Sequence, residues 1–195
     1  MEIMEIKFID TIEVIDNIIE DKNLINDLKE ESTIPSTIKG QDIFNLTIPQ
    51  KKFYDIANKL VVNYCFQNDI NFDNLKLSNF QKGNLEKYDH SKVSNHLYEP
   101  HHDMVESSLI TAIYYIDSDY NDKTWTGGEL TIYKNLTFAE YPNNAVNILS
   151  KQNRFIIFPG FLTHRVKPYF GEKPRTSIVL GWSVKDAEEI DPIII

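Results

Sequence analysis

Two of the five histidines, His101 and His102, stand directly before Asp103. Residues i and i+2 of an extended strand project to the same face, so His101 and Asp103 can bind one ion together. A third ligand has to come from elsewhere, and His164 is the only other histidine in a second β-type run. Two imidazoles and one carboxylate suit Fe(II) and leave coordination positions open for a co-substrate and dioxygen. His-x-Asp alone is a weak motif, since a single histidine is more often a surface or core residue.

Arg175 is a further candidate site residue. The chain has only three arginines against seventeen lysines, and planar bidentate binding is one reason for such a chain to use arginine. Ser177 follows Arg175 on the same face of an expected strand. An arginine that points into a β-sandwich needs an anionic partner, and its planar fork suits a carboxylate. Tyr115, near the end of another expected strand, can offer its phenol to the same group. The residues therefore predict a metal on one side and a carboxylate clamp on the other, as a 2-oxo dicarboxylic acid would require.

The elements that must position these residues follow a helix-then-strand order. Residues 11–31 carry apolar side chains in steps of three and four, which predicts an amphipathic helix with an allowed break at 21–23. A second helix is predicted from Pro49, a good first-turn residue, to Gln67. Short β-type runs with turn signals between them follow, at residues 75–81, 85–88, 109–116, 129–133, 145–149, 154–158, 163–166 and 175–184. The predicted fold class is α+β, mainly β: a β-sandwich backed by N-terminal helices.

Length and composition narrow the function classes. At 195 residues the chain is expected to form a single domain, 1–195, and its one cysteine, Cys65, excludes an intramolecular disulfide framework. The formal net charge of −9 argues against a nucleic-acid partner, because an acidic surface repels phosphate. The sequence has no apolar run that could span a bilayer and no signal-peptide pattern, so we expect a cytoplasmic protein without a membrane partner. Abundant Ile, Asn and Lys favour a bacterial or phage origin.

Six short motifs, in order, resemble one enzyme family. The chain is similar to the Fe(II)/2-oxoglutarate-dependent dioxygenases, in their prolyl 4-hydroxylase-like branch, over roughly residues 75–184. The motifs are Tyr98-Glu-Pro-His101-His-Asp103, Tyr114-Tyr115-Ile116, Gly127-Gly128-Glu129-Leu130, Phe158-Pro159-Gly160, His164-Arg165-Val166, and Arg175-Thr-Ser177 leading to Gly181-Trp182. Six ordered motifs are far more specific than His-x-Asp by itself.

The resemblance implies a fold, a set of cofactors and a set of site residues. The fold would be a double-stranded β-helix, a distorted jelly roll, over residues 71–185, with residues 1–70 as a helical support region on its larger sheet. The cofactors would be Fe(II), 2-oxoglutarate as co-substrate and O2, with ascorbate as an optional addition. The implied catalytic metal ligands are His101, Asp103 and His164. The implied co-substrate residues are Arg175, Tyr115, Ser177 and Tyr88.

The reaction implied by the resemblance hydroxylates a prime substrate and releases succinate and CO2. A prolyl residue in a protein or peptide is the first reading, and a free amino acid or other small molecule is the alternative. A third reading, from a different class, is a metal-binding jelly-roll module without turnover, which the triad and the clamp argue against. Arg175, where collagen-type relatives have Lys, points to the oxygen-sensing and bacterial side of the branch. The presence of Asp103 favours hydroxylation over halogenation.

Overall fold

The computed structural model describes residues 11–31, 46–85, 100–103, 108–117, 126–133, 145–170 and 175–184. The helices are α1 (Lys22–Glu30), α2 (Ile48–Gln67) and the short 3-10 helix η2 (Phe72–Asn74). The strands are β1 (Glu13–Asp16), β2 (Leu75–Leu85), β3 (Ile110–Asp117), β4 (Thr126–Gly127), β5 (Leu130–Tyr133), β6 (Ala145–Ile148), β7 (Arg154–Pro159), β8 (His164–Val166), β9 (Tyr169–Phe170) and β10 (Arg175–Val184).

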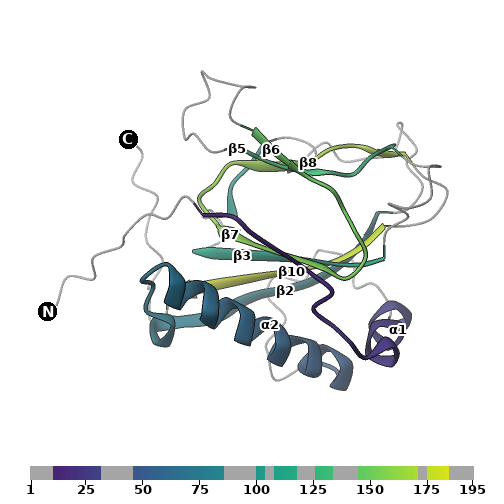
Figure 1. Ribbon diagram of the computed structural model, residues 1–195, viewed down its shortest axis with the longest axis horizontal. Helices are drawn as coiled ribbons and strands as arrows, with labels where there is room; N and C mark the ends of the chain where they lie inside the picture. Colours follow the sequence, from purple (N-terminus) through teal and green to yellow (C-terminus); the bar gives the residue numbers. More distant parts are fainter. Residues whose placement is uncertain are drawn as a thin grey trace, which may run out of the picture.

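These strands form two facing antiparallel sheets and a small ladder. The larger sheet has the order β1-β7-β3-β10-β2, the smaller sheet has the order β6-β5-β8, and β4 pairs with β9. Figure 1 shows the smaller sheet above the larger one, with α1 and α2 beneath the outer face of the larger sheet. The α+β, mainly β fold class with helices packed on the larger sheet is therefore confirmed.

The N-terminal helix prediction is wrong in its first half. Residues 13–16 form strand β1, which pairs antiparallel with the edge of β7, and α1 begins only after Asp21. The Asp21 side chain caps α1 by accepting a hydrogen bond from the Asn23 amide at 2.9 Å. The apolar spacing of this segment fits either element, and its β-branched Val14 and Ile15 fit a strand next to an open sheet edge. The predicted break at 21–23 thus coincides with the start of α1, and the segment before it contains a strand instead of a helix.

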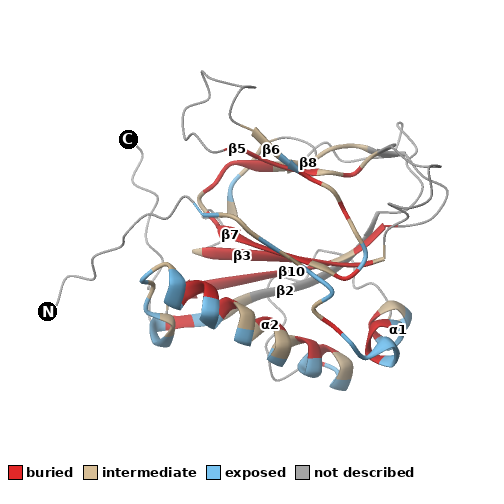
Figure 2. Cartoon of the chain, in the orientation of Figure 1, coloured by how far each residue is buried: buried red, intermediate tan, exposed pale blue. Residues whose placement is uncertain are grey.

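The second predicted helix is confirmed as α2, and its ends have clear physical causes. Thr47 and Gln50 form a capping box, and Pro49 lies in the first turn, where its missing N–H is not needed. Phe53, Ala57 and Val61 are buried on one side of the helix. Figure 2 shows this buried side facing the sheet and exposed residues on the opposite side.

Most strand predictions are confirmed, and the main difference concerns β2. The sequence predicts two separate strands at 75–81 and 85–88, but residues 75–85 form one continuous strand, and residues 86–88 lie outside the described part of the chain. Gly83 and Asn84, which look like turn residues, pair with Ser177 and Thr176 of β10 instead. A long central partner strand can hold residues of low β-propensity in a ladder, because the backbone hydrogen bonds do not depend on their side chains. The two-residue strands β4 and β9 were not predicted.

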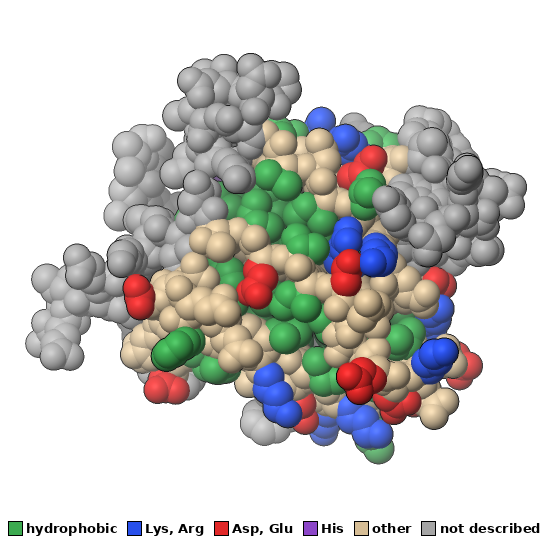
Figure 3. Space-filling view, viewed as in Figure 1, with side chains coloured by type: hydrophobic (Ala, Val, Ile, Leu, Met, Phe, Trp, Pro, Cys, Tyr) green, Lys and Arg blue, Asp and Glu red, His purple; other side chains and the backbone are tan. Residues whose placement is uncertain are grey.

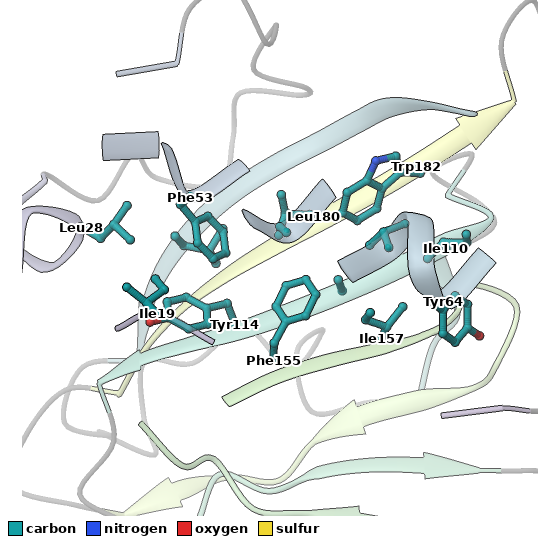
Figure 4. Packing of buried hydrophobic residues seen from close by; sticks show 14 of the residues in the cluster. Ile19, Leu28, Phe53, Tyr64, Ile110, Tyr114, Phe155, Ile157, Leu180 and Trp182 are labelled. Carbon is teal, nitrogen blue, oxygen red and sulfur yellow. The ribbon is translucent and has the colours of Figure 1, made fainter. Parts of the chain in front are cut away.

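Alternation along the central strands divides their side chains between two cores. One set of buried residues from β3, β7 and β10 packs against the helices, and Figure 4 shows members of this set, Tyr114, Phe155 and Trp182, on the helix side of the sheet. The Phe53 and Tyr114 ring centroids lie 4.7 Å apart. The alternate residues face the smaller sheet; they include Ile113, Tyr115, Ile156 and Phe158, which cluster with Leu130 and Ile132 of β5. The space between the two sheets is therefore lined by the second set.

Surface charge in the described part of the chain is mixed. On the face seen in Figure 3, Lys and Arg side chains lie among Asp and Glu side chains, so the net charge of −9 does not form a single acidic patch there. None of the helices in the described ranges has the length and apolar character needed to cross a bilayer.

An exposed ion cluster fastens β1 to the sheet. Asp16 accepts hydrogen bonds from Arg154 Nε at 2.7 Å, from Arg154 Nη2 at 3.0 Å and from Lys151 Nζ at 2.8 Å. The hydrogen bond from Arg154, aided by Lys151 and opposed by partial burial, lowers the pKa of Asp16 from 3.8 to about 2. A carboxylate whose pKa is depressed by folding stabilises the protein above its unfolded pKa, and this contribution is lost as the pH falls towards the folded value.

We expect Asp16→Asn to lower the free energy of unfolding at neutral pH by about 1 kcal/mol or less, because the ion cluster is largely solvent-exposed. The difference from the unchanged protein should shrink between about pH 4 and pH 2, since Asp16 titrates there in the folded state. Urea unfolding at about pH 7 and about pH 3 measures it. Asp55→Asn, an exposed acid on α2, is the control. An Asp16→Asn difference of the same size at both pH values would contradict the assignment.

Candidate active site

The three predicted metal ligands meet at one end of the space between the sheets. His101 and His164 form an isolated antiparallel bridge, in which each backbone N–H donates to the other residue's carbonyl, at 2.9 Å and 2.7 Å. Directly opposed residues of an antiparallel pair project to the same side. The two imidazole centroids consequently lie 4.4 Å apart. Asp103 enters the same site because its backbone N–H donates to the Gly160 carbonyl at the end of β7, at 2.8 Å.

The donor atoms of this triad lie within 4.8 Å of one another. Asp103 Oδ1 is 4.0 Å from His101 Nε2, and Asp103 Oδ2 is 3.7 Å from His164 Nε2. Both distances are too long for hydrogen bonds. The side chain of His164 is only 5% exposed, whereas those of Asp103 and His101 are 19% and 40% exposed. The site therefore has a buried inner ligand and an open outer side.

The protonation of His164 shows that this triad fits a cation. Burial lowers the pKa of His164, against the opposing effect of the Asp103 carboxylate, and this favours the neutral imidazole. Its Nδ1 lies 3.0 Å from the Leu162 carbonyl oxygen, an acceptor that requires the proton on Nδ1. The Nε2 lone pair then faces the Asp103 carboxylate, and two such groups repel each other unless a cation lies between them. Two imidazoles and a carboxylate are a donor set that suits Fe(II).

Two glycines lie against Ser108, the next described residue after Asp103: Gly160, directly after β7, and Gly181 of β10. A Cβ at Gly160 would overlap the Ser108 carbonyl oxygen, and a Cβ at Gly181 would overlap the Ser108 hydroxyl. The Ser108 amide also donates to the Asp103 carbonyl, at 3.3 Å. At position 160 the obstacle is backbone, so only glycine permits this close approach of Ser108 to the end of β7.

The predicted carboxylate clamp lies farther along the same inner face. Arg175 is 3% exposed and Tyr115 is fully buried. The Arg175 guanidinium carbon lies 5.0 Å from the centroid of the Tyr115 ring. Among the described residues, Arg175 Nε has no hydrogen-bond partner, and the Tyr115 hydroxyl has no acceptor for its proton; its one polar neighbour is Arg175, which can only donate. Burial raises the pKa of Tyr115, and the neighbouring Arg175 charge opposes the rise, so the phenol keeps its proton and can donate it.

A second arginine beside Tyr115, Arg154, differs from Arg175 in having an anionic partner. Arg154 pairs with Tyr115 in the β3–β7 register, but Asp16 neutralises its guanidinium through two hydrogen bonds. No ion pair to Arg175 exists within the described residues. A buried guanidinium without an anion is strongly unfavourable, so the Arg175 site fits an anionic ligand. A carboxylate bound here could accept hydrogen bonds from Arg175 Nε and from the Tyr115 hydroxyl.

The remaining predicted site residues have different outcomes. Ser177 is half-buried and pairs with Tyr115 in the β10–β3 register, which places it beside the clamp. Tyr88 lies outside the described residues, as does the beginning of the first motif, Tyr98. Trp182, on the opposite face from Arg175 by strict alternation, packs into the helix-side core.

Sequence reasoning missed Thr111, which the structure brings to the triad. The Thr111 hydroxyl donates to Asp103 Oδ2 at 2.6 Å. The signal was present in the sequence, because Thr111 is a polar residue inside the apolar run of β3 and lies on the same face as Tyr115 four residues later. A threonine is common enough in strands that this position did not stand out.

Comparisons with known proteins show the fold of this chain. No protein-family model matches the sequence. No curated protein matches it either. Solved structures do match. A prolyl hydroxylase from Trichoplax adhaerens, in complex with a hypoxia inducible factor peptide fragment, has a TM-score of 0.55 at 16% identity, covering 89% of this chain and 83% of that one. A Pseudomonas putida prolyl-4-hydroxylase has a TM-score of 0.57 at 12% identity, covering 89% and 88%.

A third solved structure gives the same result. An oxidoreductase of the 2OG-Fe(II) oxygenase family from Burkholderia pseudomallei has a TM-score of 0.52 at 11% identity, covering 77% of this chain and 63% of that one. The chain is thus similar in fold to prolyl hydroxylases and to a 2OG-Fe(II) oxygenase, as the six motifs predicted. Identities this low show a shared fold, and function has to be argued from the site.

Proposed function

We propose that the protein is an Fe(II)- and 2-oxoglutarate-dependent dioxygenase with a double-stranded β-helix core, and that it hydroxylates a prolyl residue in a protein or peptide. The observation that carries this proposal is the pair of buried donors, Arg175 Nε and the Tyr115 hydroxyl, which find no acceptor among the described residues and lie on the inner face that also carries the triad. A structural metal site alone would leave the buried charge of Arg175 without a purpose. A ligand that chelates a metal at one end and carries a carboxylate at the other explains both features.

The spacing of the two parts agrees with such a ligand. Thr111, beside Asp103, and Tyr115 lie on the same face of β3, four residues apart. At about 3.3 Å per residue, their Cα atoms are separated by roughly 13 Å. The side chains of the triad and of the clamp project into this interval from its two ends. An interval of this size is in the range that a five-carbon 2-oxo diacid would need, with its oxo-acid end held at the triad and its far carboxylate at Arg175.

Each residue of the chain has a distinct task in the proposed reaction. His101, Asp103 and His164 would hold the iron, which when bound supplies the activation of dioxygen. The Leu162 carbonyl orients His164 so that Nε2 faces the metal position. Arg175 and Tyr115 would bind and orient the co-substrate. The apolar side chains between the sheets, such as Ile113 and Ile156, exclude water from this region.

The prolyl substrate is supported by the comparisons and by the motif resemblance. Two of the structural neighbours are prolyl hydroxylases, and one of them is in complex with a peptide. The triad side chains most exposed to solvent, His101 and Asp103, leave an open side through which a peptide can approach. The single-domain organisation over 1–195, the requirement for ascorbate, the role of Ser177 and the cytoplasmic location stay predictions.

The proposal is tested by measuring succinate formed from 2-oxoglutarate with Fe(II) and O2, with and without candidate substrates. Proline-containing peptides should stimulate succinate formation, and mass spectrometry should find one added oxygen atom on a proline. The same peptides with alanine in place of proline are the control. Stimulation by free amino acids or other small molecules alone would replace the prolyl substrate by the alternative. If the protein neither binds nor consumes 2-oxoglutarate in the presence of Fe(II), the proposed function is wrong.

A further inference from the structure

Thr111 has a buried hydroxyl whose hydrogen-bond partner belongs to the candidate metal centre. The residue is 1% exposed, and its neighbours along β3 on both sides, Ile110 and Ala112, are buried apolar residues. A buried hydroxyl requires a hydrogen-bond partner. The Thr111 hydroxyl donates to Asp103 Oδ2 at 2.6 Å, a short distance for a hydrogen bond between two oxygens. The contact joins a central strand of the larger sheet to the anionic ligand of the triad.

This contact fixes the rotation of the Asp103 carboxylate, which the backbone hydrogen bonds of Asp103 do not determine. The Gly160 carbonyl and the Ser108 amide hold the main chain of Asp103, but neither touches its carboxylate. The terminal torsion of an aspartate is broad, so the backbone alone does not set which oxygen faces the histidines. The bond from Thr111 sets it: Oδ2 accepts the hydrogen bond from the hydroxyl and lies 3.7 Å from His164 Nε2, and Oδ1 lies 4.0 Å from His101 Nε2.

We infer that Thr111 is a positioning residue for the metal centre, which holds the Asp103 carboxylate between the imidazoles of His101 and His164, with one oxygen toward each. A carboxylate held in this way is already oriented when a metal binds, so less of its rotational freedom is lost on binding. This inference deepens the proposed function and rests on it. Contacts of this kind typically change metal affinity by about 10- to 100-fold.

The chain contains a matched control for the loss of a buried threonine hydroxyl. Thr131 of β5 is 3% exposed, and its hydroxyl donates to Asn147 Oδ1 at 2.8 Å. Thr131 and Thr111 are thus both buried threonines in strands, and the hydroxyl of each donates to the side chain of another residue. They differ in the acceptor, since Asn147 is not one of the candidate ligands. Replacing either threonine by valine keeps the shape of the side chain and removes one hydrogen bond.

The test is a calorimetric titration of Mn(II) and Co(II) into the full chain without 2-oxoglutarate. Thr111→Val should weaken binding of both metals by about 10- to 100-fold, and Thr111→Ser, which restores the hydroxyl, should recover most of the loss. Thr131→Val should leave metal affinity unchanged. Urea unfolding of the metal-free variants should show similar losses of stability for both valine variants, which separates positioning from general stability.

The outcomes distinguish this inference from the proposed function. If the unchanged protein binds metal and Thr111→Val binds it equally well, the positioning role is wrong and the dioxygenase proposal is untouched. If Thr111→Ser does not recover affinity, the hydroxyl is not the operative group. If the unchanged protein binds neither metal, both the metal centre and this inference are wrong. Should Thr111→Val not fold, Thr111→Ala and Thr111→Ser are compared in the same titration, with the same expected order of affinities.

Discussion

Asp103→Ala should abolish hydroxylation and weaken metal binding by more than about 100-fold, because loss of a contact behind a ligand alone can reach about 100-fold. Asp103 is the anionic member of the triad, and its carboxylate lies near both imidazoles. Without it, two neutral imidazoles would have to hold a dication. Succinate formation and Mn(II) titration of the purified variant, in buffer containing little free iron, measure the two effects.

His102→Ala is the matched control for this experiment. His102 stands between the two ligands in sequence but is exposed, so its removal should leave metal affinity and turnover close to those of the unchanged protein. Substantial hydroxylation by Asp103→Ala would show that the carboxylate is not a ligand. Equal losses in both variants would point to damage of the segment instead of loss of a ligand.

Arg175→Ala should weaken 2-oxoglutarate binding by roughly 10- to 150-fold. A hydrogen bond to a charged group contributes about 1.5–3 kcal/mol, and about 1.4 kcal/mol corresponds to a factor of ten. Arg175→Lys should recover part of the affinity, because it restores the charge without the planar fork. Metal affinity without co-substrate should barely change, since Arg175 is not in the triad. Separate titrations of 2-oxoglutarate, into Mn(II)-loaded protein, and of Mn(II) alone measure the two affinities.

Arg154→Lys provides the comparison for Arg175→Lys. Both arginines flank Tyr115, but Arg154 already pairs with Asp16, so its replacement by lysine should leave 2-oxoglutarate affinity nearly unchanged. Unaltered 2-oxoglutarate binding by Arg175→Ala would remove the clamp from the proposal. The triad would then be a metal site without an identified co-substrate.

The parts of the fold that could be predicted are strands whose side chains alternate clearly between the two faces of the sheet. Strand β10 was expected at residues 175–184 and has these bounds, because apolar and polar residues alternate along it and place Arg175 and Ser177 opposite Trp182. The convergence of His101 with His164 was likewise expected from their types and strand settings. Their roles, and that of Arg175, stay predictions that the experiments above test.

The parts that could not be predicted depend on contacts between distant segments. Strand β1 reads as a helix until the open edge of β7 is known, since its apolar spacing suits both elements. Gly160 looks like a simple turn residue until Ser108 is seen against it. Thr111 is an ordinary strand residue until Asp103 is brought beside it by a segment that no local pattern places. In each case the missing information is a three-dimensional neighbour.

The strand order of the larger sheet, β1-β7-β3-β10-β2, has a consequence for folding of the chain during its synthesis on the ribosome. No two neighbours in this sheet are consecutive in the chain, and β10, the last of the described strands to be synthesised, lies between β2 and β3. Sheets dominated by such long-range pairings fold slowly, because distant segments must meet before any ladder can grow. Until β10 emerges, β2 has no partner in the sheet and β3 has an open edge, and exposed edges of this kind promote aggregation. Strands β1, β7 and β3 can pair before this point, but the larger sheet cannot be completed until the strand that carries Arg175 is available, so completion of the sheet and of the anion clamp coincide.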